Sequence, residues 1–319
     1  VVIQVEAAGI CASDVKCFYG AARMWGTENT PRYIQTPVVV GHEFAGRVVA
    51  LGEHASEKTG LNIGDRAVSE QIVPCWECRY CRRGEYWMCQ RHDIYGFIGG
   101  RAEGAWANYA KLPPTLSAAH AALVEPLGCG IHAVERGNIQ LGDVVVIAGM
   151  GPIGLCMLQV ARLKGPGMLI ALDVRENRLQ LAKEMGADLT IQVKEEDAVA
   201  RVKALTEGYG CDVYIEATGS PAAVEQGLKM IRKLGTFVEF SVMSGPSSID
   251  WSVIGDEKEL NIHGAHLSPY AYPLAIEYLD KGVVQADKLI THRLPLSRFR
   301  DGLELAHAGE ESIKVQLIP

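Results

Sequence analysis

The pattern of hydrophobic positions changes near residue 141, and the two parts of the chain predict different folds. Beyond that point, short apolar runs alternate with stretches in which apolar residues recur about every 3.6 positions, as in parallel strands joined by helices. The predicted strands are 144–148, 168–173, 189–192, 213–217, 236–240 and 261–265. The predicted helices between them are 153–164, 176–185, 197–206 and 222–232. This α/β pattern predicts a doubly wound parallel sheet with helices on both faces.

The first part of the chain has short β-rich runs separated by glycine and proline. These runs are 1–7, 37–40, 44–51, 66–69 and 106–112, and they predict a small barrel-like β domain. A further helix is predicted at 272–281, and the alternating segment 313–318 is expected to pair with the first domain. We therefore expect one domain formed by 1–127 and 264–319 and a second formed by 128–263, which agrees with a length of 319 residues.

Composition narrows the function classes. The chain is 48% hydrophobic and 22% charged, and its net charge of −7 argues against a nucleic-acid partner, which needs concentrated Lys and Arg. Its apolar runs are shorter than the roughly 20 residues that span a bilayer, so we expect no membrane partner. Nine cysteines without secretory features indicate reduced thiols and metal ligands, and we expect a cytoplasmic protein.

Four cysteines lie close together in the sequence. Cys75, Cys78, Cys81 and Cys89 follow a C-x-x-C-x-x-C-x7-C pattern. Two intervening residues let neighbouring thiolates reach one zinc ion, which takes four such ligands tetrahedrally. The alternative is a disulfide cluster or a set of unrelated buried thiols. Because protein would fill all four positions, we expect a structural zinc.

A glycine-rich segment predicts a dinucleotide site. The sequence Gly149-Met150-Gly151-Pro152-Ile153-Gly154 follows the predicted strand 144–148 and opens a predicted helix. The glycines permit a tight turn, approach of a pyrophosphate and close helix packing, although a turn without a ligand is the alternative. Asp173 ends the next predicted strand and is placed to bind a ribose, which favours NAD over NADP. Arg175 and Arg178 lie nearby and could soften that preference.

A second group of candidate metal ligands is scattered along the chain. Cys11, the adjacent pair His42 and Glu43, and Glu125 carry the donor types of a zinc site. Their spacing alone does not unite them, and each could be an ordinary structural residue.

The motifs taken together resemble the zinc-dependent medium-chain alcohol dehydrogenases, and in particular their sorbitol or polyol dehydrogenase branch. The resemblance runs nearly end to end and rests on six segments in a fixed order: 9–14 (Gly-Ile-Cys-Ala-Ser-Asp), 41–43 (Gly-His-Glu), the cysteines of 75–89, 125–127 (Glu-Pro-Leu), 149–154 and 216–219 (Glu-Ala-Thr-Gly). It implies a GroES-like catalytic domain, a Rossmann coenzyme domain and an active-site zinc in the cleft between them.

The resemblance also implies roles for individual residues. Cys11 and His42 would bind the catalytic zinc, with Glu43 and Glu125 as direct or water-bridged ligands, and Asp14 would orient His42. A glutamate at 125, where alcohol dehydrogenases proper usually have cysteine, indicates the polyol branch. Ser13 would relay the proton released by the substrate. Arg178 and Thr218 would join the glycine loop and Asp173 at the cofactor. Three further side chains are candidates for the substrate pocket: Trp25, Phe97 and His266.

The implied reaction is hydride transfer from a secondary alcohol of a polyol to NAD+, giving a ketose. Lys16 and Cys17 depart from the histidine and tyrosine that family members often have there. Together with Met24 and Trp25, they favour a short polyol over pentitols and hexitols. The alternatives are a threonine-type amino-alcohol or simple alcohol dehydrogenase, and an inactive protein that binds zinc and nucleotide. The resemblance implies a homodimer or homotetramer, with the strand 261–265 as a candidate for pairing between subunits.

Overall fold

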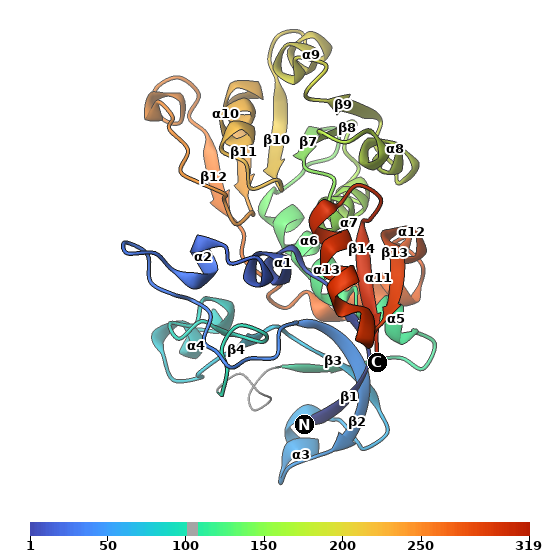
Figure 1. The fold of residues 1–319 in the computed structure, drawn as a ribbon. Coiled ribbons are helices and arrows are strands. Elements are labelled where there is room, and N and C mark those ends of the chain that lie inside the picture. Colours follow the sequence, from blue (N-terminus) through green and yellow to red (C-terminus); the bar gives the residue numbers. More distant parts are fainter. Residues whose placement is uncertain (101–107) are drawn as a thin grey trace. The chain divides into compact units, whose positions relative to one another are not determined.

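The chain divides into two compact units. The computed structural model describes residues 1–100 and 108–319. Unit 1 comprises Val1–Gly128 and Leu267–Pro319, and unit 2 comprises Cys129–His266. The elements of both are labelled in Figure 1.

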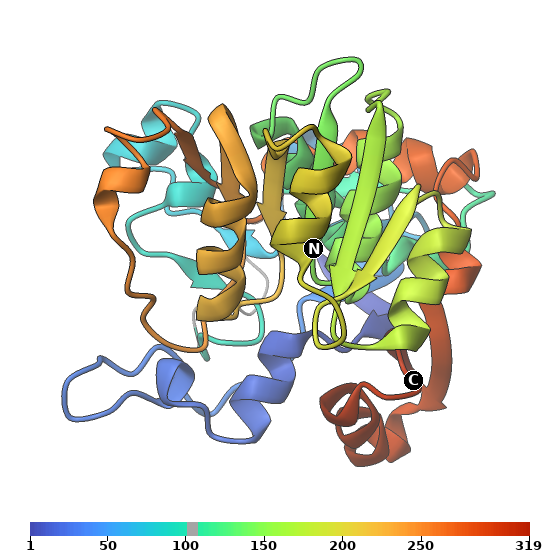
Figure 2. The ribbon, with the colours of Figure 1, turned by 90° about the horizontal axis from the view of Figure 1, so that it is seen from above.

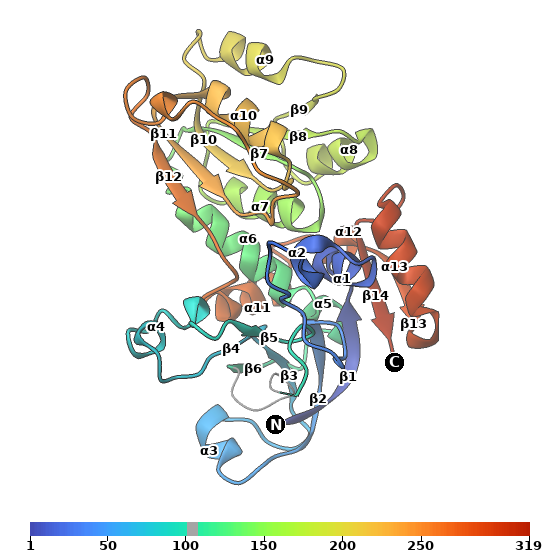
Figure 3. The same ribbon diagram turned by 60° about the vertical axis from the view of Figure 1, so that its left-hand side comes forward.

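Unit 2 is a six-stranded parallel sheet with the order β12-β11-β10-β7-β8-β9. Its strands are β7 (Val144–Ala148), β8 (Met168–Asp173), β9 (Leu189–Gln192), β10 (Cys211–Glu216), β11 (Ile231–Glu239) and β12 (Asn261–Gly264). Its helices are α7 (Pro152–Arg162), α8 (Glu176–Glu184), α9 (Ala198–Leu205), α10 (Pro221–Met230) and the short η2 (Trp251–Val253). Helices cover both faces of the sheet (Figure 2, Figure 3). The predicted doubly wound sheet is confirmed.

The strand order of unit 2 explains where a ligand would bind. β7 pairs with both β8 and β10, so the chain runs from β7 outward through β8 and β9 and then crosses back to the other side of β7 to form β10. Val145, Val146 and Ile147 of β7 are fully buried, as expected for a strand covered on both faces. In sheets of this type, ligands bind at the carboxyl ends of the strands beside this switch point. The glycine-rich loop emerges there.

Unit 1 is built on a six-stranded sheet with the order β13-β14-β1-β2-β3-β6 and a two-stranded sheet of β4 and β5. The strands are β1 (Val2–Gly9), β2 (Glu43–Ala50), β3 (Arg66–Ser69), β4 (Ile72–Val73), β5 (Asp93–Ile94), β6 (Tyr109–Lys111), β13 (Ile290–Pro295) and β14 (Lys314–Ile318). β14 pairs antiparallel with β1, which confirms the expected return of the 313–318 segment to the first domain.

The helices of unit 1 are short apart from those late in the chain. They are α1 (Ala12–Phe18), α2 (Ala22–Trp25), α3 (Ala55–Thr59), α4 (Arg79–Arg82), η1 (Tyr86–Met88), α5 (Ala118–Ala121), α11 (Tyr272–Asp280), α12 (Ala286–Leu289), η3 (Leu296–Arg298) and α13 (Phe299–Ala308). The sequence boundary between the units falls within α6 (Val124–Arg136). None of the helices in the described ranges combines the length and apolar composition needed to span a bilayer.

One predicted strand is wrong and another is only partly described. Segment 37–40 is not a strand. Its valines have high β propensity, but no strand in the described ranges pairs with them, and Val39 is 84% exposed. The predicted strand 106–112 appears as β6, while residues 106 and 107 lie outside the described residues.

Candidate metal centres and nucleotide-binding loop

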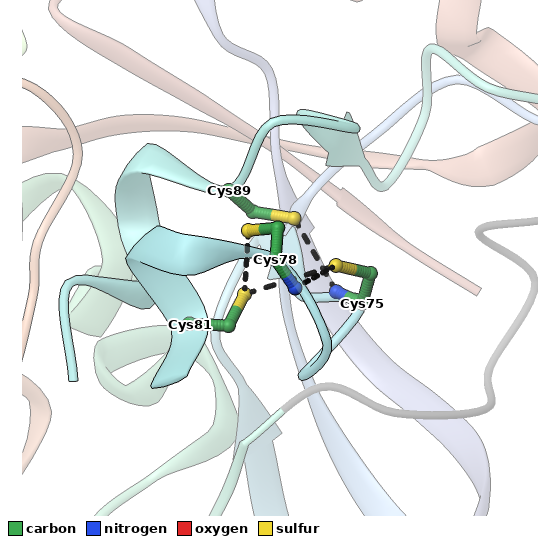
Figure 4. Close-up of side chains that lie close together, drawn as sticks. All are labelled: Cys75, Cys78, Cys81 and Cys89. Atoms are coloured by element: carbon green, nitrogen blue, oxygen red, sulfur yellow. Dashed lines mark hydrogen bonds between the residues drawn. The ribbon is translucent and has the colours of Figure 1, made fainter. Parts of the chain in front are cut away.

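The four cysteines of 75–89 converge. Their Sγ atoms lie within 4.8 Å of one another, and Figure 4 shows them facing one another. The Sγ of Cys81 is 3.5 Å from that of Cys78 and 4.0 Å from that of Cys75. A tetrahedron of thiolates about 2.3 Å from zinc has edges of about 3.8 Å, so the separations fit one zinc ion. All nine cysteines, which lie within the described ranges, have free thiols, so the disulfide alternative is not seen.

The pKa values of the clustered cysteine thiols favour a bound cation. Backbone hydrogen bonds from Gln90 and Cys81 lower the pKa of the Cys78 thiol to about 6. A backbone hydrogen bond from Glu77 likewise lowers the pKa of Cys75. Burial instead raises the pKa of Cys81 to about 12, so this thiol needs a metal ion to lose its proton near neutral pH. The donor set therefore fits zinc.

Strand pairing brings the second candidate group together. β1 and β2 are antiparallel neighbours with Gly9 opposite Glu43, so Cys11, just beyond β1, meets His42, just before β2. One donor atom from each of Cys11, His42 and Glu43 lies within 4.8 Å of the others. Gly9 is needed because a Cβ there would overlap Glu43 Oε2. A thiolate, an imidazole and a carboxylate that converge in this way are a suitable ligand set for zinc.

His42 is buried between Asp14 and Phe97. Its Nδ1 lies 3.5 Å from Asp14 Oδ1, and its ring centroid is 5.4 Å from that of Phe97. Asp14 Oδ2 accepts a hydrogen bond from Cys11 N at 2.8 Å. Neither His42 Nδ1 nor Asp14 Oδ1 has a hydrogen-bond partner among the described residues. This pairing leaves the other ring nitrogen for a metal, as in the carboxylate–histidine–zinc arrangement.

The charges around His42 favour a cation. Burial alone lowers the pKa of His42, but the negative charges of Asp14, Cys11 and Glu125 outweigh it, and the net shift is well upward. The site thus attracts positive charge, either a proton on His42 or a metal ion.

A buried lysine pairs with Glu43. Lys314 of β14 donates to Glu43 Oε1 at 2.8 Å, to Glu43 Oε2 at 2.6 Å and to Ile10 O at 3.2 Å. The Lys314 and Glu43 side chains are only 2% and 0% exposed. Burial alone lowers the pKa of Lys314, but the charges of Glu43 and Cys11 outweigh it, and the net shift is upward. Glu43 is therefore held by an ammonium group as well as being within reach of a metal.

Glu125 lies outside this group of three. It is in the first turn of α6, is buried, and accepts a hydrogen bond from Gln71 Nε2 at 2.8 Å. Ser13 is half-buried in the first turn of α1, two residues after Cys11. Lys314 and Gln71 were not predicted from the sequence.

The three pocket candidates differ in their surroundings. Phe97 is buried against the His42 ring. Trp25 is 39% exposed and donates from Nε1 to Cys17 O at 2.7 Å. His266 belongs to unit 2 and is half-buried. Phe97 thus lies beside the proposed zinc ligand His42.

The glycine-rich loop has the geometry of a dinucleotide-binding turn. Gly149 has a φ of +96°, and a Cβ at Gly154 would overlap Gly149 O. A Cβ at Gly151 would have Arg178 Nη1, 3.8 Å away, as its nearest described neighbour. Pro152 begins α7, and no side chain caps the start of the helix. A helix N-terminus without a side-chain cap, beside an open glycine, fits a pyrophosphate.

Asp173 stabilises this loop. Its Oδ2 accepts a hydrogen bond from Met150 N at 2.6 Å, and its Oδ1 accepts one from Arg175 N at 2.9 Å. Burial lowers the pKa of Arg178 and outweighs the opposing effect of the Asp173 charge. One carboxylate and one guanidinium therefore lie at the end of β8, beside the loop.

Thr218 lies on the other side of the loop. Its backbone N and its Oγ1 donate to Glu216 Oε1 at 2.7 and 2.5 Å, which fixes the turn after β10. A Cβ at Gly149 would be 2.9 Å from Thr218 Cγ2. The residues assigned to the cofactor from sequence, including Ile153 at the start of α7, thus surround one loop of unit 2.

Comparisons with known proteins match both units. Residues 1–123 match the alcohol dehydrogenase GroES-like domain, and residues 152–281 match the zinc-binding dehydrogenase domain. The chain is 52% identical to an erythritol/L-threitol dehydrogenase of Mycolicibacterium smegmatis, covering 99% of this chain and 90% of the relative. It is 33% identical to a sorbitol dehydrogenase of Bacillus subtilis (100% and 90%) and 34% identical to an L-threonine 3-dehydrogenase of the same species (100% and 91%).

Solved structures of alcohol dehydrogenases share the fold of this chain. The alcohol dehydrogenase TADH from Thermus sp. ATN1 superposes with a TM-score of 0.87 at 30% identity, covering 99% of this chain and 91% of that one. A short chain alcohol dehydrogenase from E. coli CFT073, complexed with NADH, superposes with a TM-score of 0.85 at 27% identity, with coverage of 99% and 91%.

Proposed function

The chain belongs to the zinc-binding alcohol dehydrogenases with a GroES-like domain, and we propose that it oxidises a secondary hydroxyl of a short polyol with NAD+ as the hydride acceptor. The products are a ketose, NADH and a proton. The observation that carries the reaction class is the convergence of Cys11, His42 and Glu43 within 4.8 Å in a chain that also has a dinucleotide-binding turn.

Two centres would hold zinc. Cys75, Cys78, Cys81 and Cys89 are a closed set of four thiolates, which suits a structural ion. Cys11 and His42, with Glu43 or Glu125, would hold the catalytic ion and leave a position for substrate. When bound, the catalytic zinc lowers the pKa of a substrate hydroxyl, and NAD+ accepts the hydride from the adjacent carbon.

The protein side chains would position the metal and move the proton. Asp14 faces His42 Nδ1 and would fix the ring so that its other nitrogen points at the metal. Lys314 holds the carboxylate of Glu43 and limits the negative charge of the ligand set. Ser13 Oγ would accept the proton of the substrate hydroxyl and pass it toward solvent, which its half-buried position allows.

Asp173 supports NAD as the cofactor. Its carboxylate stands at the end of β8 beside the glycine loop, where it would bind ribose hydroxyls and repel a 2′-phosphate. Arg178, near Gly151 and Asp173, would then stack on or bond the adenosine end of the cofactor. Thr218, which packs against Gly149, would line the same cofactor site.

A four-carbon polyol is the substrate that we favour. The relative with 52% identity over 99% of this chain is named an erythritol/L-threitol dehydrogenase, whereas the sorbitol and threonine enzymes share 33% and 34%. We expect purified protein to reduce NAD+ with erythritol or threitol faster than with sorbitol, L-threonine or 2-propanol, as measured by NADH absorbance. Rapid oxidation of 2-propanol without activity on polyols of four to six carbons would refute the proposal.

A matched pair of variants tests the site. His42→Gln should abolish this activity, while His54→Asn, at a histidine exposed on the surface, should retain it. Metal analysis should find about two zinc ions per chain, because each ligand set is suited to one ion. One ion per chain with no activity would instead support an inactive zinc- and nucleotide-binding protein.

Assembly and location are also proposed. β12 is one of the two edge strands of the unit 2 sheet and is largely exposed, so it could pair with its copy in a homodimer or homotetramer. Light scattering on the purified protein should give the mass of two or four chains, and the mass of a single chain would contradict this assembly.

Free thiols at all nine cysteines support a reducing compartment, and we propose the cytoplasm.

A further inference from the structure

A buried glutamine lies against Glu125. Gln71 occupies the connection between β3 and β4 and is only 1% exposed. Its Nε2 donates to Glu125 Oε1 at 2.8 Å. A neutral donor beside a buried carboxylate stabilises the charged form and gives it a defined direction.

The orientation of the Gln71 amide is fixed from the other side. Ser268 Oγ donates to Gln71 Oε1 at 3.2 Å, and the hydroxyl of Tyr272 lies 3.4 Å from the same oxygen. Both residues are buried and come from the segment that follows unit 2. A carboxylate can only accept, so the NH₂ end of the amide faces Glu125, and the hydroxyls, which can donate or accept, donate to the carbonyl end.

Packing around α6 keeps these partners together. Gly128 is one helical turn after Glu125, on the same side of α6. A Cβ at Gly128 would be 2.9 Å from Ser268 Cβ and 3.4 Å from Tyr272 Cδ1. The glycine therefore lets α6 approach the Ser268–Tyr272 segment closely enough for the hydrogen-bonded chain to form.

We propose that Gln71 is a positioning residue that holds Glu125 Oε1 and thereby presents Oε2 to the catalytic metal or to a water bound to it. This rests on the proposed function only in assigning Glu125 to the catalytic centre. Glu43 has Lys314 as a bidentate partner. For Glu125, the uncharged amide of Gln71 holds one carboxylate oxygen and thereby sets the direction of the carboxylate.

The test replaces Gln71 with a residue of similar volume that has no hydrogen-bond donor. Gln71→Met should weaken retention of the catalytic metal against a chelator by about 10- to 100-fold, the usual effect of losing a partner that orients a ligand. With Co²⁺ in the catalytic site, its visible absorption bands should shift. With polyol as substrate, kcat should fall while the KM for NAD+ stays within about twofold, because the cofactor residues are untouched.

Gln159→Met is the matched control. Gln159 is also a buried glutamine, but its Nε2 donates to Leu155 O of its own helix in unit 2. This variant should keep the cobalt spectrum and the metal retention of the parent. Ser268→Ala, which removes only one donor to the Gln71 carbonyl, should cause a smaller shift of the same kind and serves if Gln71→Met does not fold.

A charge swap separates positioning from packing. Gln71→Glu with Glu125→Gln preserves an amide–carboxylate hydrogen bond but moves the charge to position 71. We expect this double variant to fold and still to show weakened metal retention and a shifted cobalt spectrum. Recovery of parental values in the swap, or parental values in both Gln71→Met and Ser268→Ala, would overturn the proposal. If the parent oxidises no polyol but the cobalt bands of Gln71→Met still shift, the proposed function fails and the positioning role stands.

Discussion

Replacing Lys314 with methionine should destabilise unit 1 strongly. The substitution removes an ammonium group that contacts both oxygens of Glu43 at 2.6 and 2.8 Å, in a place where neither side chain is more than 2% exposed. Removing one partner of a buried ion pair leaves an uncompensated charge and costs about 3–5 kcal/mol. We expect that loss in the free energy of unfolding, measured with urea and followed by tryptophan fluorescence.

Two comparisons show whether charge is the cause. Lys314→Met combined with Glu43→Gln removes both charges and should recover all but about 1–2 kcal/mol of the loss. Lys281→Met breaks the exposed pair with Glu277 and should leave the free energy of unfolding nearly unchanged.

The pH dependence has a definite sign. The pKa of Lys314 is higher in the folded protein than its value of about 10.5 in the unfolded chain. Its contribution to the free energy of unfolding is therefore complete at pH values below about 10.5 and is lost only as the pH rises through the folded-state pKa. The parent should therefore keep this contribution through neutral pH. A bound metal could compensate Glu43, so the measurement is made before and after chelation. A loss below about 1 kcal/mol in both states would refute the reasoning.

Three further predictions concern the four cysteines of 75–89 and the glycine-rich loop. Cys78→Ser should lower the zinc content by about one ion per chain and lower the melting temperature, since four thiolates close that site; unchanged zinc content would contradict this. Gly154→Ala should abolish NADH binding, measured by fluorescence titration, because the added Cβ would overlap Gly149 O. An NADH affinity within about twofold of the parent would contradict this close packing. Asp173→Ala should raise the KM for NAD+ by about tenfold or more and raise kcat/KM for NADP+ relative to that for NAD+, because it removes a hydrogen-bond acceptor for the ribose and a negative charge. An unchanged ratio of the two kcat/KM values would show that Asp173 does not select the cofactor.

The parts of the fold that could be predicted are those specified by local patterns. The strand and helix periods of unit 2 predicted its six strands, because a parallel sheet buried on both faces needs continuous apolar runs. The spacing of the cysteines likewise predicted a cluster that the structure forms. Segment 37–40 was wrong because β propensity does not supply a neighbouring strand.

The partners of the candidate catalytic residues could not be predicted in this way. Lys314 alternates with Ile313 and Val315, a pattern that suggests a solvent-facing lysine, but the structure buries it against Glu43. Gln71 has no sequence signal that links it to Glu125, which is 54 positions away. Both contacts depend on how distant segments pack, and local periodicity carries no information about that.

The pairing of β14 with β1 has a consequence for the order in which the protein is made. The ribosome synthesises β14 after the whole of unit 2, so a nascent chain already contains Cys11, His42 and Glu43 while Lys314 is still missing. During that interval Glu43 has no ammonium partner, and the ligand set carries one more uncompensated negative charge than in the finished protein. A chain that ends before β14 would therefore present the Glu43 carboxylate without the ammonium group that pairs with it in the finished protein.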